Sequence, residues 1–217
     1  TAKEIAERLA MPSATTYRLL NLLVADGYIV RLPDLSGFAL GPRMGLLIDA
    51  AVSPTVCTKA RETLAELRLS VRFGVHLFYF TNTSVRLADA DSEYPPPADE
   101  SVLNRHLHAS AVGKLLLAEK RDADTLLALT PAALTDRTIT SKSALAEQLA
   151  EIRECGYAAQ TGELRADSAC VAVPVRSATA TLVAAVAMSG RAEQEQLLRK
   201  QVPALQDCAT QLAPLLA

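Results

Sequence analysis

Apolar positions near the start of the chain recur at helical spacing. Ile5, Ala6 and Leu9 form one apolar stripe, and Thr1 followed by Glu4 has the spacing of a capping box. A short amphipathic helix is therefore expected to begin at the first residue.

A second helix is predicted from about Pro12 to Asp26. Pro12 suits the first position of a helix, and Gly27 suits the position just after one. Successive residues of a helix lie about 100° apart around its axis, and this spacing separates two faces of different chemistry. One face carries Thr16, Leu19, Leu20 and Leu23. The opposite face carries Ala14, Tyr17, Arg18 and Asn21.

Two short β-type runs, YIVRL and FALG, follow and are separated by the turn-forming stretch PDLSG. Helix, tight turn, helix and hairpin is the order of a winged helix-turn-helix, whose second helix lies in the major groove of DNA. Ser13 and Thr15 suit phosphate contacts, and Arg18 and Asn21 suit base edges. Arg31, in the hairpin, suits the flanking backbone. Any solvated helix face carries such residues, but the four elements together favour DNA binding.

The charge of this module argues against DNA binding by a single copy. Residues 1–45 hold five basic and four acidic side chains, a net charge of +1, and the whole chain has a formal net charge of −2. Phosphate contacts dominate the affinity of proteins for DNA. One module is therefore expected to bind weakly and to need a symmetric partner on a second half-site.

Beyond residue 42 the pattern changes to a mixture of helices and strands. RMGLLIDAAV predicts a short linker helix, and a longer helix carries Val56, Ala60, Leu64 and Leu67 at helical spacing. Strands are predicted at 74–80, 84–90, 170–176 and 181–189, and a Pro-rich loop at YPPPADE. Further helices are predicted at 109–119, near 122–129, at 143–155 and at the C-terminus, the last interrupted by Pro203 and Pro214. Adjacent strand pairs mixed with helices indicate a sheet with helices packed against it, of α/β (α+β) class.

Composition narrows the class of protein. The longest apolar run without a charge, residues 177–190, is shorter than the roughly 20 residues that span a bilayer. With no secretion signal in view, no membrane partner and a cytoplasmic location are expected. Cys57, Cys155, Cys170 and Cys208 show no zinc-ligand spacing, so we interpret them as buried free thiols and predict no metal or cofactor.

The segment HLHASAVGKLLLA, residues 106–118, invites three chemical interpretations. Its Gly-Lys pair suggests a phosphate-binding loop, but the Gly and the Ser or Thr that this motif needs on either side are absent. His106 and His108 would share a face of a strand and permit a metal site, although no third ligand is in view. Residues 109–113 begin a helix, where backbone N–H groups favour a bound carboxylate; an ordinary buried helix start is the plainer alternative.

Catalysis at Cys170, with a histidine as base, is a further alternative. A nucleophilic thiol needs a lowered pKa and some exposure, and the apolar strand around Cys170 supplies neither. The pattern therefore does not favour an enzyme.

Four separate blocks of the sequence carry a resemblance to a known family. MPSATTYRLLNLLVADGYI with FALGPRM is similar to the DNA-reading helix and wing of the IclR family of bacterial transcriptional regulators. HLHASAVGKLLLA resembles the C-terminal signature of that family. ITSKSALAEQLAEIRECGYA and then CVAVPV with AMSG match its later blocks in the same order. The resemblance covers nearly the full length of the chain.

The resemblance implies three parts. They are a winged helix-turn-helix at 1–42, a linker helix at 43–54, and a GAF-like effector-binding and oligomerisation domain at 55–217 with an antiparallel sheet flanked by helices. The family's winged module has a helix before the two seen here, so we interpret that helix as absent from this chain, which would expose Leu9 and Leu20. Members of the family assemble as homodimers or pairs of dimers, and linked modules gain effective concentration.

The resemblance also implies an effector pocket between the start of the HASAVGK helix and the C-terminal strands. The residues carried over to it are Arg105, Ala111, Val112, Gly113, Gln160, Cys170 and Ser189. Arg105 would add a charge-assisted contact to an acidic ligand. Gln160 stands where some members carry an acidic contact, and Ala187 where a second serine is sometimes found, so the effector can differ from theirs.

The sequence as a whole predicts a ligand-responsive regulator of transcription. It would bind a palindromic double-stranded DNA operator, as a repressor or an activator, and respond to a small acidic or aromatic metabolite. The alternative is a small-molecule-processing enzyme or a ligand-sensing module built on the C-terminal domain.

Overall fold

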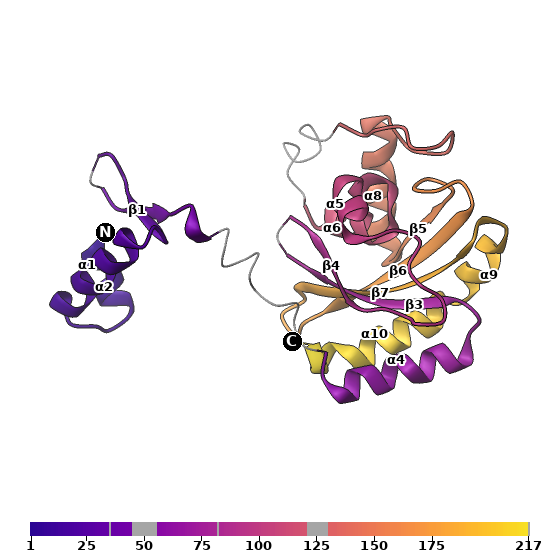
Figure 1. The fold of residues 1–217 in the computed structure, drawn as a ribbon, viewed down its shortest axis with the longest axis horizontal. Helices are drawn as coiled ribbons and strands as arrows, with labels where there is room; N and C mark the ends of the chain where they lie inside the picture. Colours follow the sequence, from indigo (N-terminus) through magenta and orange to yellow (C-terminus); the bar gives the residue numbers. More distant parts are fainter. Residues whose placement is uncertain (35, 45–55, 82, 121–129, 217) are drawn as a thin grey trace. The chain divides into compact units, whose positions relative to one another are not determined.

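Residues 1–34, 36–44, 56–81, 83–120 and 130–216 are described by the computed structural model of the chain (Figure 1). The chain divides into two units, Thr1–Val52 and Ser53–Ala217. This division falls inside the predicted linker at 43–54. Most of the predicted linker helix, and the whole of the helix predicted near 122–129, lie outside the described residues.

The N-terminal unit consists of two helices followed by a hairpin. They are α1 (Ala2–Arg8), α2 (Ser13–Ala25), β1 (Ile29–Arg31) and β2 (Phe38–Leu40), and the two strands pair antiparallel. The predicted capping box is present, because Thr1 Oγ1 accepts a hydrogen bond from the Glu4 N–H at 3.3 Å and the Glu4 carboxylate accepts one from the Thr1 amino group at 2.7 Å. The order of elements is the one that the sequence predicts.

The bounds of α2 follow from the residues at its ends. Pro12 precedes the helix rather than being its first residue, since its ψ of 134° is extended. Gly27 follows the helix with a φ of +76°, a left-handed conformation that glycine adopts readily. Leu9 is 61% exposed, as expected, but the expected exposure of Leu20 is wrong. Leu20 is buried together with Thr16 because α1 packs against α2.

The C-terminal unit is built on a single antiparallel sheet. Its strands are β3 (Gly74–Phe80), β4 (Val85–Asp89), β5 (Ala158–Thr161), β6 (Ser168–Arg176) and β7 (Leu182–Arg191). They lie in the order β4-β3-β7-β6-β5. Four of these strands coincide with predicted ones within two residues. The pattern does not predict β5, because AAQT is short and lacks the bulky apolar side chains that are typical of strands.

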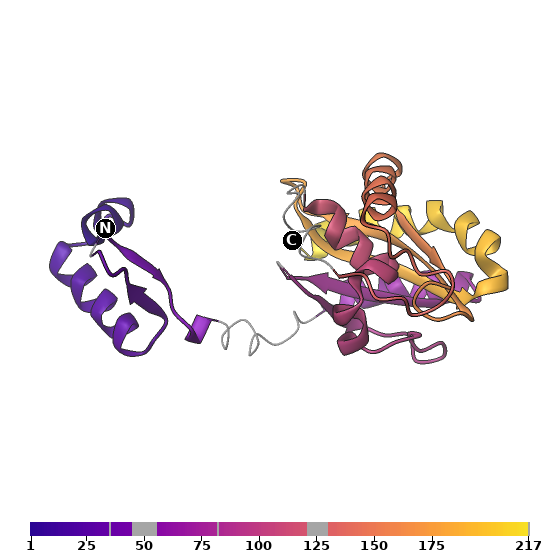
Figure 2. The same cartoon turned by 90° about the horizontal axis from the view of Figure 1, so that it is seen from above.

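Helices cover both faces of this sheet (Figure 1), and Figure 2 shows the same layers from above. One face carries α4 (Thr58–Ser70), α9 (Glu195–Lys200) and α10 (Val202–Leu216). The other carries α5 (Glu100–Arg105), α6 (Ala111–Glu119) and α8 (Lys142–Cys155). Each face has its own apolar core, the first around Leu64 and Leu205 and the second around Leu145 and Phe78. Within the described residues, no helix is long and apolar enough to cross a membrane.

Two helices differ from the predicted pattern. The break near the C-terminus falls at Gln201, between α9 and α10 and two residues before Pro203, whereas α10 continues through Pro214. Pro203 lies in the first turn of α10, where a missing N–H costs nothing, and Pro214 lies inside the last turn. The pattern does not predict α5. Asp99 caps the start of this helix, since its Oδ1 accepts a hydrogen bond from the Val102 N–H at 2.9 Å.

A buried ion pair joins α6 to the turn before β6. Lys114 is fully buried, and its Nζ lies 2.5 Å from Oε1 of Glu163, which is also buried. Burial lowers the pKa of Lys114 and raises the pKa of Glu163, and in each case the charged partner opposes the shift. Lys114 therefore holds two elements together and does not reach a ligand as the lysine of a phosphate-binding loop would.

Candidate functional site

A cavity lies between the sheet and the start of α6. It measures about 370 Å³, including the part open to solvent. Its apolar lining consists of Phe78, Pro96, Pro97, Ala98, Leu103, Leu164 and Ala187. Its polar lining consists of His76, Ser110, Gln160, Cys170 and Ser189, with Ala111 and Val112 at the helix start. The residues come from β3, β5, β6, β7, α6 and the loop before α5, so the fold brings together segments that are far apart in the sequence.

Five of the seven predicted effector-binding residues line this cavity: Ala111, Val112, Gln160, Cys170 and Ser189. Gly113 and Arg105 are not among the lining residues. A Cβ at Gly113 would lie 2.3 Å from the carbonyl oxygen of Leu107, so this glycine allows α6 to pack against the preceding turn. Arg105 ends α5 with an exposed side chain, so the geometry does not support the predicted contact with an acidic ligand.

The start of α6 presents hydrogen-bond donors to the cavity. Ser110 caps the helix, and its Oγ accepts from the Gly113 N–H at 3.0 Å. The N–H groups of Ala111 and Val112 have no acceptor among the described residues. Both residues line the cavity, and the first N–H groups of a helix attract negatively charged groups.

Gln160, on β5, contributes a second donor. Its Oε1 accepts a hydrogen bond from the backbone N–H of Glu163 at 3.0 Å, and the side chain is buried. Because this bond assigns the oxygen to the Glu163 side, the amide NH₂ is the group that Gln160 can offer to a ligand.

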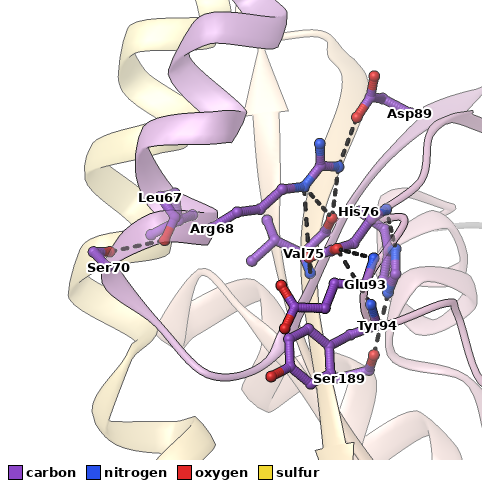
Figure 3. A network of polar contacts seen from close by, with 10 residues as sticks. Leu67, Arg68, Ser70, Val75, His76, Asp89, Glu93, Tyr94 and Ser189 are labelled. Carbon is purple, nitrogen blue, oxygen red and sulfur yellow. Dashed lines mark hydrogen bonds and ion pairs between the residues drawn. The ribbon is translucent and has the colours of Figure 1, made fainter.

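His76, on β3, and Ser189, on β7, form a third polar element of the wall. His76 Nε2 lies 3.2 Å from Ser189 Oγ, and His76 Nδ1 accepts from the backbone N–H of Asp91 at 3.3 Å (Figure 3). Burial lowers the pKa of His76 to about 4, which outweighs the opposing effect of the Asp91 carboxylate. His76 is therefore neutral near pH 7.

Arg68, on α4, connects the opposite face of the sheet to this wall (Figure 3). Its Nη2 donates to the carbonyl oxygen of Val75 at 2.8 Å and to Oδ1 of Asp89 at 2.6 Å. Its Nε lies 3.6 Å from Oδ2 of Asp91. Burial favours the protonated form of Asp91, but hydrogen bonds from three backbone N–H groups and the Arg68 charge outweigh it and lower the pKa of Asp91. Asp91 is thus ionised, and its carboxylate links the start of the loop after β4 to Arg68 on α4.

Cys57 and Cys155 are exposed free thiols, so the expectation that all four cysteines are buried is wrong.

Cys170 does not have the environment of a nucleophile. Burial raises the pKa of its thiol to about 12. His76 lines the same cavity, but its two ring nitrogens are already hydrogen-bonded to Ser189 and Asp91, so neither is left to deprotonate the thiol. The geometry therefore gives no support to catalysis at Cys170.

Neither His106 nor His108 lies on a strand: His106 is the residue that follows α5, and His108 lies in the short helical turn Leu107–Ala109 before α6. Their ring centroids are 6.1 Å apart, and His108 Nε2 is hydrogen-bonded to the carbonyl oxygen of Ala132 at 3.0 Å. His108 is thus a buried histidine with a structural partner. Within the described residues, no group of three potential metal ligands comes together.

The N-terminal unit presents the predicted DNA-facing residues of α2 on its surface. Ser13, Ala14, Thr15, Tyr17, Arg18 and Asn21 are all exposed. Arg18 makes no hydrogen bond or ion pair with another described residue, so its guanidinium group is available. The described part of this unit therefore has a polar helix face with one uncommitted cation.

Arg31 bridges α2 and the hairpin. Its Nη2 donates to Oδ1 of Asn21 at 2.6 Å, and its guanidinium carbon lies 5.4 Å from the centre of the Phe38 ring. This contact engages the side-chain oxygen of Asn21. Asn21 therefore keeps only its NH₂ group for another partner while the contact persists.

The sequence reasoning missed the cavity residues that come from β3 and from the loop before α5. His76 and Phe78 lie on a strand whose two faces are both covered and whose residues are nearly all buried, so the pattern does not tell which face holds a site. The run YPPPADE indicates a loop but not what the loop covers. Period-two spacing, which places His76 and Phe78 on one face, is the signal that was available.

Both units match known families of protein sequence. Residues 49–213 match the family described as bacterial transcriptional regulator IclR C-terminal. Residues 1–33 match the IclR helix-turn-helix domain.

Similar proteins of known sequence or structure include several regulators. HTH-type transcriptional regulator BhcR of Paracoccus denitrificans is 29% identical over 204 residues, covering 88% of this chain and 70% of that protein. KdgR of Escherichia coli is 28% identical over 193 residues, covering 86% and 73%. A solved IclR homologue from Microbacterium hydrocarbonoxydans, complexed with 4-hydroxybenzoate, has a TM-score of 0.63 and 25% identity, covering 100% of this chain and 90% of that one. The Thermotoga maritima IclR structure has a TM-score of 0.64 and 24% identity, with the same coverage.

Proposed function

Because this chain belongs to the IclR family of bacterial transcriptional regulators, we propose that its operator affinity is controlled by a small organic acid bound in the C-terminal cavity. A ligand can do this only through different affinities for two arrangements of the protein. The observation that carries the proposal is a small set of hydrogen-bond donors in a cavity wall that is otherwise apolar.

The donors come from three separate elements. The N–H groups of Ala111 and Val112 are unpaired among the described residues, and the NH₂ of Gln160 is the free end of its amide. Ser189 adds a hydroxyl. A carboxylate accepts hydrogen bonds on both oxygens, so it matches such a wall, and bonds to an ionised acceptor are the stronger kind.

The remaining wall suits an apolar ligand body. Phe78, Leu103, Leu164 and the prolines of the loop surround the polar groups. A pocket with mostly apolar lining and a few placed polar groups is typical of small-molecule sites. The 4-hydroxybenzoate held by the solved homologue is an acid with a flat apolar ring, which supports extending this ligand class to the present chain.

A thermal-shift screen of the full chain tests the ligand class. We expect benzoate, 4-hydroxybenzoate or short aliphatic carboxylates to raise the melting temperature in a concentration-dependent way, because a ligand that binds only the folded state stabilises it by mass action. The corresponding alcohols serve as the matched control. If alcohols stabilise the chain as much as acids do, the acid class is wrong.

Replacing Ser189 with alanine is expected to weaken carboxylate binding by about tenfold or more, the range for a hydrogen bond to a charged group. Titration calorimetry with the carboxylate found in the screen measures the change. Ser143→Ala, at an exposed position on α8, is the control and should leave the affinity unchanged. Equal affinity in the Ser189 variant and the parent would remove Ser189 from the site.

We further propose that α2 reads the operator through Arg18 and that Arg31 acts from the hairpin. Asn21 needs both its oxygen and its NH₂ to read adenine in the bidentate way, and Arg31 holds the oxygen. Arg18 has no such commitment. Because the unit has a net charge of only +1 over residues 1–45, we propose that two or four copies bind a roughly palindromic operator together.

Replacing Arg18 with alanine is expected to weaken operator binding by about 1–3 kcal/mol per site, the range for one bidentate contact with a base. Fluorescence anisotropy with operator and scrambled DNA measures the change, which should be larger for the operator. Arg8→Ala, on α1, removes the same charge from the same unit and serves as the control. A similar loss with both DNA molecules would assign Arg18 to the phosphate backbone.

A further inference from the structure

We propose that His76 is a positioning residue that fixes Ser189 as a hydrogen-bond donor toward the cavity and so favours ligands with an anionic oxygen. This inference rests on the proposed function, because it concerns the ligand class of the same cavity. It adds His76 to the residues that determine which ligands the cavity prefers, and Ser189 is the residue through which His76 acts.

The proton of the neutral His76 ring has a defined position. The backbone N–H of Asp91 points to Nδ1 at 3.3 Å, and a backbone amide nitrogen can only donate. Nδ1 must therefore carry a lone pair, and a neutral imidazole then carries its proton on Nε2. The hydrogen bond between Nε2 and Ser189 Oγ, at 3.2 Å, is thus donated by the histidine.

The backbone N–H of Asp91 is fixed in position by the side chain of the same residue. Oδ1 of Asp91 accepts from the N–H groups of Glu93 and Tyr94 at 2.9 and 3.3 Å, and Oδ2 accepts from the Val75 N–H at 3.3 Å. Arg68 adds its charge from α4 (Figure 3). The carboxylate therefore fixes the backbone around its own N–H, which excludes the other tautomer of His76.

The hydroxyl of Ser189 has its proton available for the cavity. Its oxygen accepts from His76, so its own proton must point elsewhere. No other hydrogen bond of this hydroxyl is made to a described residue, and Ser189 lines the cavity. A Cβ at Gly74 would lie 2.9 Å from His76 Nε2 and 3.0 Å from Ser189 Oγ, so the glycine leaves the pair its space.

As a consequence, the Ser189 hydroxyl and the N–H groups at the start of α6 all act as hydrogen-bond donors toward the cavity. If His76 had the opposite tautomer, Ser189 would donate to the ring and would offer the cavity a lone pair. With the tautomer fixed by Asp91, Ser189 offers its proton, in agreement with the unpaired N–H groups at the start of α6. Donated bonds from several directions favour a carboxylate over an alcohol of the same shape.

Two substitutions at position 76 test the roles of the two ring nitrogens separately. His76→Gln keeps a donor near the place of Nε2, and His76→Asn keeps an acceptor near the place of Nδ1 but cannot reach Ser189. The readout is the ratio of the affinities of the full chain for benzoate and benzyl alcohol, measured by titration calorimetry. We expect His76→Asn to lower this ratio about fivefold, within the range of one hydrogen bond, and His76→Gln to restore most of it.

A double-mutant cycle tests that His76 acts through Ser189. In the Ser189→Ala background, His76→Asn should lower the ratio no further. His106→Asn, which alters a histidine outside the cavity lining, is the matched control and should not change the ratio. If His76→Asn has the same effect with and without Ser189, the positioning role is wrong.

The tautomer itself has a readout that needs no ligand. Long-range ¹H–¹⁵N correlation spectra of the full chain should show Nδ1 of His76 unprotonated and Nε2 protonated near pH 7. The opposite pattern would overturn the inference whatever the affinities are. If neither probe binds the wild-type chain, the proposed ligand class is contradicted, and the spectra alone decide the state of His76.

Discussion

Replacing Lys114 with methionine is expected to lower the free energy of unfolding of the C-terminal unit by about 3–5 kcal/mol, the cost of breaking a buried ion pair from one side. Lys114 is fully buried, and among the described residues it is the ion-pair partner of Glu163. Without it, the Glu163 carboxylate stays buried and uncompensated. Urea unfolding at pH 7, followed by circular dichroism, measures the loss.

Two further variants separate the pair from simple loss of packing. Lys114→Met combined with Glu163→Leu should recover most of the stability, because neither side then leaves a buried charge. Disrupting the exposed pair of Arg199 and Glu195 by Glu195→Gln should cost less than about 1 kcal/mol. A double variant no more stable than Lys114→Met alone would show that the shape of the lysine, and not its charge, is what α6 requires.

Stability is expected to fall as the pH drops from about 6.5 to about 4 because of His76. The pKa of His76 is lowered from 6.5 to about 4 in the folded chain, mainly by burial, with Asp91 and Asp89 opposing the shift and Arg68 adding to it. Between these pH values the unfolded chain binds a proton at this histidine that the folded chain does not bind. His76 therefore stabilises the fold fully above about pH 6.5, and up to about 3 kcal/mol is lost by about pH 4.

The contribution of His76 can be isolated by subtraction. Urea unfolding of the parent and of His76→Gln is compared at several values between pH 7 and pH 4, since every other titrating group is common to both chains. The stability of the parent relative to the variant should decrease as the pH falls through this window. A difference that stays constant would show that the folded chain protonates His76 as easily as the unfolded one.

Local signals account for most of the secondary structure. The capping box at Thr1, the glycine after α2 and the run of bulky apolar residues in β3 each act within a few residues, and the corresponding elements lie where they are expected. The pattern failed where an element depends on distant contacts. β5 forms because β6 provides its hydrogen-bonding partner, and Leu20 is buried because α1 covers it.

The same distinction applies to the cavity. The resemblance of the signature HLHASAVGKLLLA and of the later strands to a known family led to five lining residues, whereas the residues alone favoured an ordinary helix start. His76 could not be assigned because its partners Asp91 and Ser189 depend on the loop after β4 and on the pairing of β3 with β7. The charge of Arg105 suggests a contact with an acidic ligand, but its place at the exposed end of α5 follows from tertiary packing.

The cavity lining contains no arginine, lysine, aspartate or glutamate among the described residues, and this has a consequence for ionic strength. An acid held there would be bound by hydrogen-bond donors at contact distance, which dissolved ions screen little. Operator binding releases counterions from DNA and therefore weakens steeply as salt is added. Raising the salt concentration should thus dissociate the DNA while leaving effector affinity nearly constant, so that the two equilibria can be measured separately on one intact chain.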